Sequence, residues 1–142
     1  TNFRYVKPEN LAGERPNFAT IDVSFISLKL ILPVLKTLLA PESDVIALVK
    51  PQFEAGREQV GKKGIVRDPK VHEAVLQDVM AFAVNEGYNV MNLSYSPITG
   101  GDGNIEFLLH LFFSGTKEKG ENFLSVVPAD VVSTAHKELR SK

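Results

Sequence analysis

The chain has 142 residues, a formal net charge of −1 and 44% apolar residues, a composition typical of one globular domain with a hydrophobic core. It contains no cysteine, which excludes disulfides and thiolate chemistry and suits a reducing, cytoplasmic setting. Its three histidines are far apart in the sequence, so we expect no metal site. The most apolar stretch, residues 25–40, is interrupted by Lys29, Pro33 and Lys36 and is too short to span a bilayer, so no membrane partner is expected.

The first half of the chain predicts a strand, a helix and a second strand. Residues 18–23 are predicted to form the first strand. Leucine and isoleucine recur at helical spacing over residues 28–39, with Ser27 as a suitable N-cap and Pro33 expected to bend the helix. Residues 44–50 are almost continuously apolar, which is typical of a strand covered on both faces.

The second half predicts a loop, a helix, two strands and a final helix. Residues 51–64 are expected to form a long loop, because glycine recurs through them. Residues 68–87 predict a helix that begins at an Asp-Pro pair and ends at a glycine. Strands are expected at residues 88–95 and 106–113, and a last helix at residues 129–140.

This order of elements predicts an α/β fold. Alternating strands and helices indicate a mostly parallel sheet with helices on both faces. The Gly-rich turn at residues 97–104 is too short for a parallel crossover, so the final strand must be antiparallel. The same turn opens no helix, and it is therefore not a phosphate-binding loop.

Three ionisable residues lie where predicted strands meet loops. Asp22 and Lys50 follow the first two strands, and Glu106 begins the last one. Ligands of open α/β sheets bind at the carboxyl ends of parallel strands, and an antiparallel strand starts at that same edge. We therefore expect two carboxylates and an amine to meet there and to activate a hydroxyl group. Each residue also has an ordinary explanation: Asp22 as a helix cap, Lys50 reaching solvent along its apolar stem, and Glu106 paired with Lys50.

Several long segments resemble the TlyA-type family, known as hemolysins and as FtsJ-like ribosomal RNA 2'-O-methyltransferases. The resemblance covers essentially all of the chain. It implies a Rossmann-like, S-adenosylmethionine-dependent methyltransferase sheet with an antiparallel final strand, and methylation of ribose 2'-hydroxyls in ribosomal RNA as the activity of the parent protein. The matching segments are residues 2–4, 21–28, 48–57 (LVKPQFEAGR), 64–69 (GIVRDP) and 96–108 (SPITGGDGNIEFL).

The resemblance also implies roles for the three charged residues. The FtsJ-like group uses a Lys-Asp-Lys-Glu tetrad, in which Asp22 resembles the Asp, Lys50 the second Lys and Glu106 the Glu. The first Lys, the Gly-rich cofactor loop, the acidic residue that holds the cofactor ribose and a small N-terminal RNA-binding domain have no counterpart here. We therefore expect residues 1–142 to be the C-terminal part of one methyltransferase domain. The main cofactor determinants are then expected upstream of Thr1, and the chain alone is expected to be inactive.

The chemistry of ribose methylation suits these residue types. A ribose hydroxyl is a weak nucleophile at neutral pH, so an enzyme must align it and help to remove its proton. As an ammonium, Lys50 would stabilise the developing alkoxide, and as a neutral amine it would accept the proton. Asp22 and Glu106 would orient the amine and favour the ammonium, which makes charge stabilisation the preferred role.

Ribosomal RNA or a ribosomal subunit is the partner that the resemblance implies. Phe25, Arg57, Lys62 and Lys63 are candidates for RNA contact, because aromatic rings stack on unpaired bases and cations bind phosphate. Core packing is the preferred alternative for Phe25, and simple solvation explains Lys62 and Lys63 equally well.

Two other functions stay open. One is a non-catalytic module that binds RNA or the ribosome. The other is a membrane-lytic hemolysin, which is disfavoured because an amphipathic helix between two strands normally packs on the core. In addition, the strand at residues 18–23 is expected to be an apolar edge that pairs with another copy, giving a homodimer, unless an upstream segment covers it.

Overall fold

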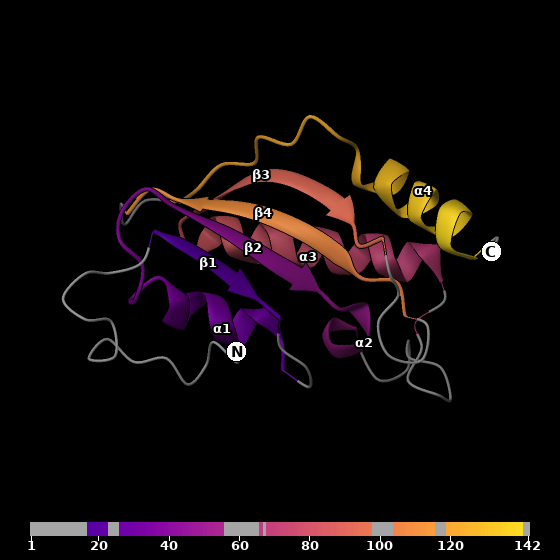
Figure 1. Ribbon diagram of the computed structural model, residues 1–142, viewed down its shortest axis with the longest axis horizontal. Coiled ribbons are helices and arrows are strands. Elements are labelled where there is room, and N and C mark those ends of the chain that lie inside the picture. Colours follow the sequence, from indigo (N-terminus) through magenta and orange to yellow (C-terminus); the bar gives the residue numbers. More distant parts are fainter. Residues whose placement is uncertain are drawn as a thin grey trace.

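Strands and helices alternate along the chain (Figure 1). The computed structural model describes residues 17–22, 26–55, 66, 68–97, 104–115 and 119–140. In chain order the elements are β1 (Phe18–Ile21), α1 (Leu28–Leu35), β2 (Ser43–Val49), α2 (Pro51–Glu54), α3 (Pro69–Asn85), β3 (Tyr88–Tyr95), β4 (Phe107–Phe113) and α4 (Pro128–Arg140).

The strands form one mixed sheet in the order β1-β2-β4-β3. β1 pairs with β2 in parallel, whereas β4 pairs antiparallel with both β2 and β3. β1, β2 and β3 therefore run in one direction, and β4 runs against them from its place between β2 and β3. The predicted α/β class, with an antiparallel final strand, is confirmed.

One face of the sheet carries the hydrophobic core. Nearly all the alternate residues that point to this face are buried, and the register aligns them in rows such as Ile21, Ala47 and Leu109. The buried faces of α1 and α3 belong to the same core cluster. Figure 1 shows α3 behind the sheet in this view.

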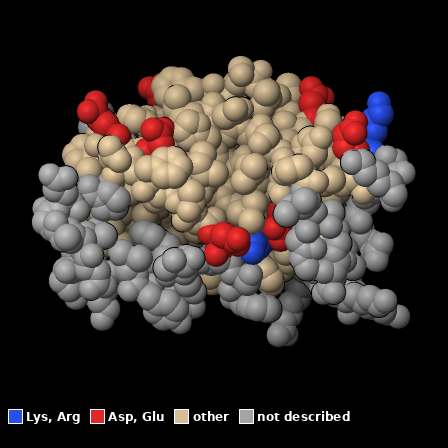
Figure 2. Space-filling view, in the orientation of Figure 1, with Lys and Arg blue, Asp and Glu red and all other residues tan. Residues whose placement is uncertain are grey.

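The opposite face is only partly buried and carries both apolar side chains and the Asp44–His110 ion pair. Ile46, Leu48, Leu108 and Phe112 point to it and retain intermediate exposure. Figure 2 shows this face as a broad uncharged surface, with most charges at its rim. In the described part of the chain, the helices that join the core cluster cover one face of the sheet. The prediction of helices on both faces is therefore met for that face only.

The predicted helix caps and helix ends are largely confirmed. Ser27 is the N-cap of α1 and accepts from the Lys29 amide, and Asp68 caps α3 in the same way. Gly87 has a φ of 94°, a left-handed conformation that ends α3 at low cost. The predicted loop after Lys50 was partly wrong, because its first four residues form α2, with proline at a position that favours helix initiation.

A buried hydrogen bond ties β3 to α1. The fully buried Tyr88 donates its hydroxyl proton to the Leu32 carbonyl at 2.6 Å, and burial raises the pKa of this phenol. The Leu32 carbonyl also accepts from the Lys36 amide at 3.3 Å, so it would keep a partner without the tyrosine.

We predict that Tyr88→Phe lowers the free energy of unfolding by about 1 kcal/mol, because one net hydrogen bond is lost while the carbonyl remains bonded. Denaturant unfolding of both proteins measures this difference. A loss above about 3 kcal/mol would contradict the prediction, since it would mean that the carbonyl is left unpaired.

Candidate functional site

Four chain segments meet at one edge of the sheet. Asp22 follows β1, Lys50 follows β2, Ser96 follows β3 and Glu106 precedes β4. Because β4 alone is reversed, its first residue lies at the same edge as the last residues of its neighbours. The predicted convergence of Asp22, Lys50 and Glu106 on one edge is therefore present.

Lys50 and Asp22 form an ion pair across this edge. Lys50 Nζ lies 2.6 Å from Asp22 Oδ1, and the lysine side chain is only 12% exposed whereas the aspartate is 68% exposed. Removing an ammonium group from water is costly unless an anion compensates it. The pair thus holds a nearly buried cation beside a carboxylate that still faces solvent. In Figure 2 a basic group lies between acidic groups at the lower margin of the visible face.

Glu106 lies opposite Lys50 in the antiparallel ladder. Val49 pairs with Phe107, and the same register continued by one residue aligns Lys50 with Glu106. Glu106 is 6% exposed and accepts a hydrogen bond from Gln52 Nε2 at 3.0 Å. Its main-chain carbonyl accepts from the Ser96 amide at 2.8 Å, so both neighbouring strand ends fix this residue.

Glu54, the last residue of α2, reaches the start of α1. One carboxylate oxygen accepts from the Ser27 hydroxyl at 2.6 Å and the other accepts from the Leu28 amide at 2.8 Å. Burial raises the pKa of this carboxyl, against the two hydrogen bonds, which favour the carboxylate. The N-terminus of α1 is capped by Ser27 and Glu54, so the structural alternative of Asp22 as its cap was wrong.

Buried polar side chains near the start of β4 form a second set of hydrogen bonds, which centres on the main chain of Val66. The buried Asn104 accepts through Oδ1 from the Val66 amide at 2.9 Å. His72 is fully buried, and its Nε2 lies 2.9 Å from the Val66 carbonyl while its Nδ1 lies 2.8 Å from His136 Nε2. Because a carbonyl only accepts, His72 Nε2 carries a proton. These bonds anchor position 66 against both β4 and α4.

Other predicted site residues lie outside the described part of the chain. These are Phe25, Arg57, Lys62 and Lys63, the candidates for RNA contact, together with most of the Gly-rich turn. Within the described residues, no group of three His, Asp or Glu side chains is arranged to hold a metal ion.

Gln52 and Glu54 were not among the site residues predicted from the sequence. Both belong to the segment LVKPQFEAGR, but a predicted loop gave no reason to assign them contacts. The Lys-Pro pair at residues 50 and 51 was the available signal, because proline is favoured in the first turn of a helix. Once α2 is recognised, residues 52 and 54 must point in nearly opposite directions, since successive helical residues are rotated by about 100°.

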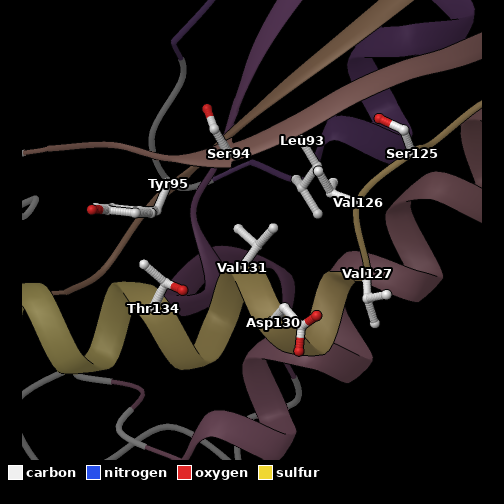
Figure 3. Close-up of a pocket in the computed structure, with 9 residues that line it drawn as sticks. All are labelled: Leu93, Ser94, Tyr95, Ser125, Val126, Val127, Asp130, Val131 and Thr134. Atoms are coloured by element: carbon white, nitrogen blue, oxygen red, sulfur yellow. The ribbon is translucent and has the colours of Figure 1, made fainter.

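A groove runs along β3 beside α4 (Figure 3). It has a volume of about 460 Å³. Leu93 and Tyr95 line its β3 side, and Val131 and Thr134 on α4 point toward that strand. The remaining lining residues are Ser94, Ser125, Val126, Val127 and Asp130.

The raised pKa of Glu54 predicts a pH dependence of stability. Compared with the unfolded chain, the folded protein favours the protonated form of the Glu54 carboxyl. This group therefore contributes its full stabilisation below its ordinary pKa of 4.5. The contribution is lost as pH rises through the higher pKa of the folded state. In Glu54→Gln this titration is absent. The unfolding temperature of the wild type relative to Glu54→Gln should therefore fall as pH rises above about 4.5. Thermal unfolding of both proteins across pH measures it, and a difference that stays constant or rises would contradict the prediction.

Comparison with known proteins identifies the family. Residues 1–113 match the FtsJ-like methyltransferase family. The chain is 62% identical over 142 residues to YqxC of Bacillus subtilis, provisionally named an rRNA methyltransferase, and covers 50% of it. It is 39% identical over 111 residues to the 16S/23S rRNA (cytidine-2'-O)-methyltransferase TlyA of Mycobacterium tuberculosis, with 78% of this chain and 41% of that protein covered.

A solved structure extends the comparison to three dimensions. A protein of Streptococcus thermophilus, provisionally named a hemolysin, superposes with a TM-score of 0.90 at 52% identity, covering 99% of this chain and 50% of that one. No helix in the described residues is long and apolar enough to cross a membrane. The chain spans about half the length of the curated relatives it matches. It belongs to the FtsJ-like methyltransferase family, whose named relatives include rRNA methyltransferases and hemolysins.

Proposed function

We propose that this chain forms the acceptor side of a methyltransferase that modifies ribose 2'-hydroxyls in ribosomal RNA. The observation that carries the proposal is the nearly buried Lys50 ammonium, held by Asp22 and aligned with Glu106 at the carboxyl edge of the sheet. The family match and the 2'-O specificity in the name of the TlyA relative support it. Cytoplasmic ribosomes and their RNA are the corresponding partners.

Lys50 is assigned the central role in this proposal. A 2'-hydroxyl becomes a better nucleophile as its proton leaves, and the negative charge that develops on oxygen is stabilised by a nearby cation. Asp22 orients the Lys50 ammonium through the 2.6 Å contact. Glu106, fixed by Gln52 and Ser96, lies opposite Lys50 in the strand ladder.

S-adenosylmethionine is the cofactor that belongs to this proposal, and when bound it supplies an electrophilic methyl group. The residues at this edge are an amine, two carboxylates and an amide, which suit a hydroxyl. The sequence has no Gly-rich turn that follows a strand and opens a helix, so this half does not fit as the cofactor's nucleotide cradle. We therefore assign no principal cofactor-binding residue within this chain.

The second candidate function is a non-catalytic RNA-binding module. Titration calorimetry with S-adenosylmethionine, on this chain and on the complete protein, separates the candidates. Under our proposal the complete protein binds the cofactor and methylates RNA, and the 142-residue chain alone does not turn over. Absence of cofactor binding by the complete protein would favour the non-catalytic module.

We predict that Lys50→Ala in the complete protein lowers methyl transfer by roughly 10²-fold or more while cofactor affinity changes little, because the charge that stabilises the developing oxyanion is removed. Methyl incorporation into ribosomal RNA and cofactor calorimetry measure the two effects. Lys36→Ala is the matched control, since it removes another lysine ion pair, that with Glu86. Normal turnover of Lys50→Ala would contradict the assignment.

The basic segment after α2 gives a separate prediction for RNA binding. If Lys62 and Lys63 contact phosphates, changing both to Glu should make the fall of log affinity with log salt shallower. The magnitude of the slope should decrease by roughly 1.4–1.8, because about 0.7–0.9 counterions are released per phosphate contact. Lys119→Glu, an exposed lysine near the start of β3, is the control. RNA binding by the complete protein at several salt concentrations measures the slopes, and an unchanged slope removes both lysines from the interface.

A further inference from the structure

The four-residue helix α2 directly follows Lys50 and contacts both Glu106 and the start of α1. Lys50, immediately before it, pairs with Asp22 after β1. Gln52 bonds to Glu106 before β4, and Glu54 bonds to Ser27 and Leu28 at the start of α1. α1 follows the segment that contains Asp22. Lys50 and the helical turn that follows it therefore link the ends of β1, β2 and β4.

The geometry of a helical turn explains how so short an element makes both contacts. Residues two apart in an α-helix are rotated by about 200° around its axis, so Gln52 and Glu54 point to opposite sides. Gln52 faces β4 and Glu54 faces α1. Pro51 at the first helical turn restricts the backbone between Lys50 and these anchors. Movement of either anchor is therefore transmitted to the lysine through a short, stiff connection.

Within the described part of the chain, the contact made by Gln52 leaves a buried polar atom unpaired, which destabilises the folded state. Gln52 Nε2 donates to Glu106, and among the described residues the buried Oε1 has no hydrogen-bond partner. An unpaired buried carbonyl is destabilising, and folded proteins retain few of them. Leucine would fill a similar volume without this cost. A polar residue is useful here because it fixes the orientation of the Glu106 carboxylate.

The Glu54 contact joins α2 to the start of α1. It satisfies the Leu28 amide, one of the donors that a helix N-terminus leaves unpaired, and places negative charge at the positive end of the α1 dipole. It also accepts the Ser27 hydroxyl proton while Ser27 Oγ accepts from the Lys29 amide. The start of α1 and the end of α2 are thus joined at two points.

We propose that Gln52 and Glu54 are positioning residues for methyl transfer, which together hold Lys50 in line with Asp22 and Glu106. The inference rests on the proposed function. Neither residue is required to touch the RNA. Their effect is on the orientation of the amine, and displacement by about 1 Å at a reacting centre lowers turnover by up to about 10²-fold.

Methyl-transfer kinetics of the complete protein test Gln52. Gln52→Leu should lower kcat by roughly 10-fold to 100-fold with little change in the KM for RNA, because orientation is lost while binding contacts remain. Gln52→Glu should be equally impaired at neutral pH, where two carboxylates repel, and should recover as pH falls and one proton is shared between them. Gln52→Leu should not recover. This pH-dependent rescue would not arise from a purely structural role.

Two variants test Glu54. In Glu54→Gln, the amide oxygen can accept from Leu28 while the amide nitrogen donates to Ser27 Oγ, so both contacts survive and kcat should stay within about 3-fold of wild type. Glu54→Ala removes both contacts and should lower kcat by roughly 10-fold or more. Circular dichroism checks that each variant is folded at the assay temperature, and assays below the unfolding temperature of Glu54→Ala keep the comparison valid.

The outcomes separate this inference from the proposed function. If Lys50→Ala is inactive but Gln52→Leu and Glu54→Ala turn over normally, the positioning role is wrong and the proposed function stands. If the wild-type protein transfers no methyl group to RNA, the proposed function fails. If Gln52→Leu and Gln52→Glu have identical pH profiles, Gln52 does not act through Glu106.

Discussion

The reversed direction of β4 is the constraint on which the candidate site depends. A fourth strand parallel to β2 would begin at the far edge of the sheet and place Glu106 a strand length away from Lys50. Insertion of an antiparallel strand between β2 and β3 instead aligns Glu106 with Lys50 in the ladder. The same reversal puts Ser96 beside Glu106, where its amide bonds to the Glu106 carbonyl. One topological feature thus assembles groups from four chain segments.

The electrostatics of the site follow from this topology. A lysine with 12% exposure requires an anion nearby, and Asp22 supplies it from the neighbouring parallel strand. Asp22 remains largely exposed, so the ion pair stays open on one side. A nearly buried cation beside a solvent-facing carboxylate is suited to receive a polar group from outside. Under the proposed function such an arrangement is preorganised, because the positive charge is already in place before the reaction.

Polar contacts beneath the edge link the site to distant elements. Asn104 and His72 both bind the main chain of Val66, and His72 also contacts His136 on α4. The start of β4 is therefore held from the side of α3 and α4, while α2 holds it through Gln52. Since buried polar groups are costly when unpaired, these networks favour one arrangement of the strand end over alternatives.

The sequence by itself determined most of the elements and the antiparallel last strand, and it singled out Asp22, Lys50 and Glu106 as candidates, because hydrophobic periodicity, caps and the length of a turn are local properties. The Ser27 and Asp68 caps and the stop at Gly87 belong to the same local information. Only the tertiary structure decided that Lys50 pairs with Asp22, that Gln52 fixes Glu106 and that Glu54 caps α1. These contacts join residues 26 to 54 positions apart, and their partners depend on how the strand ends are brought together in space, which no local pattern encodes.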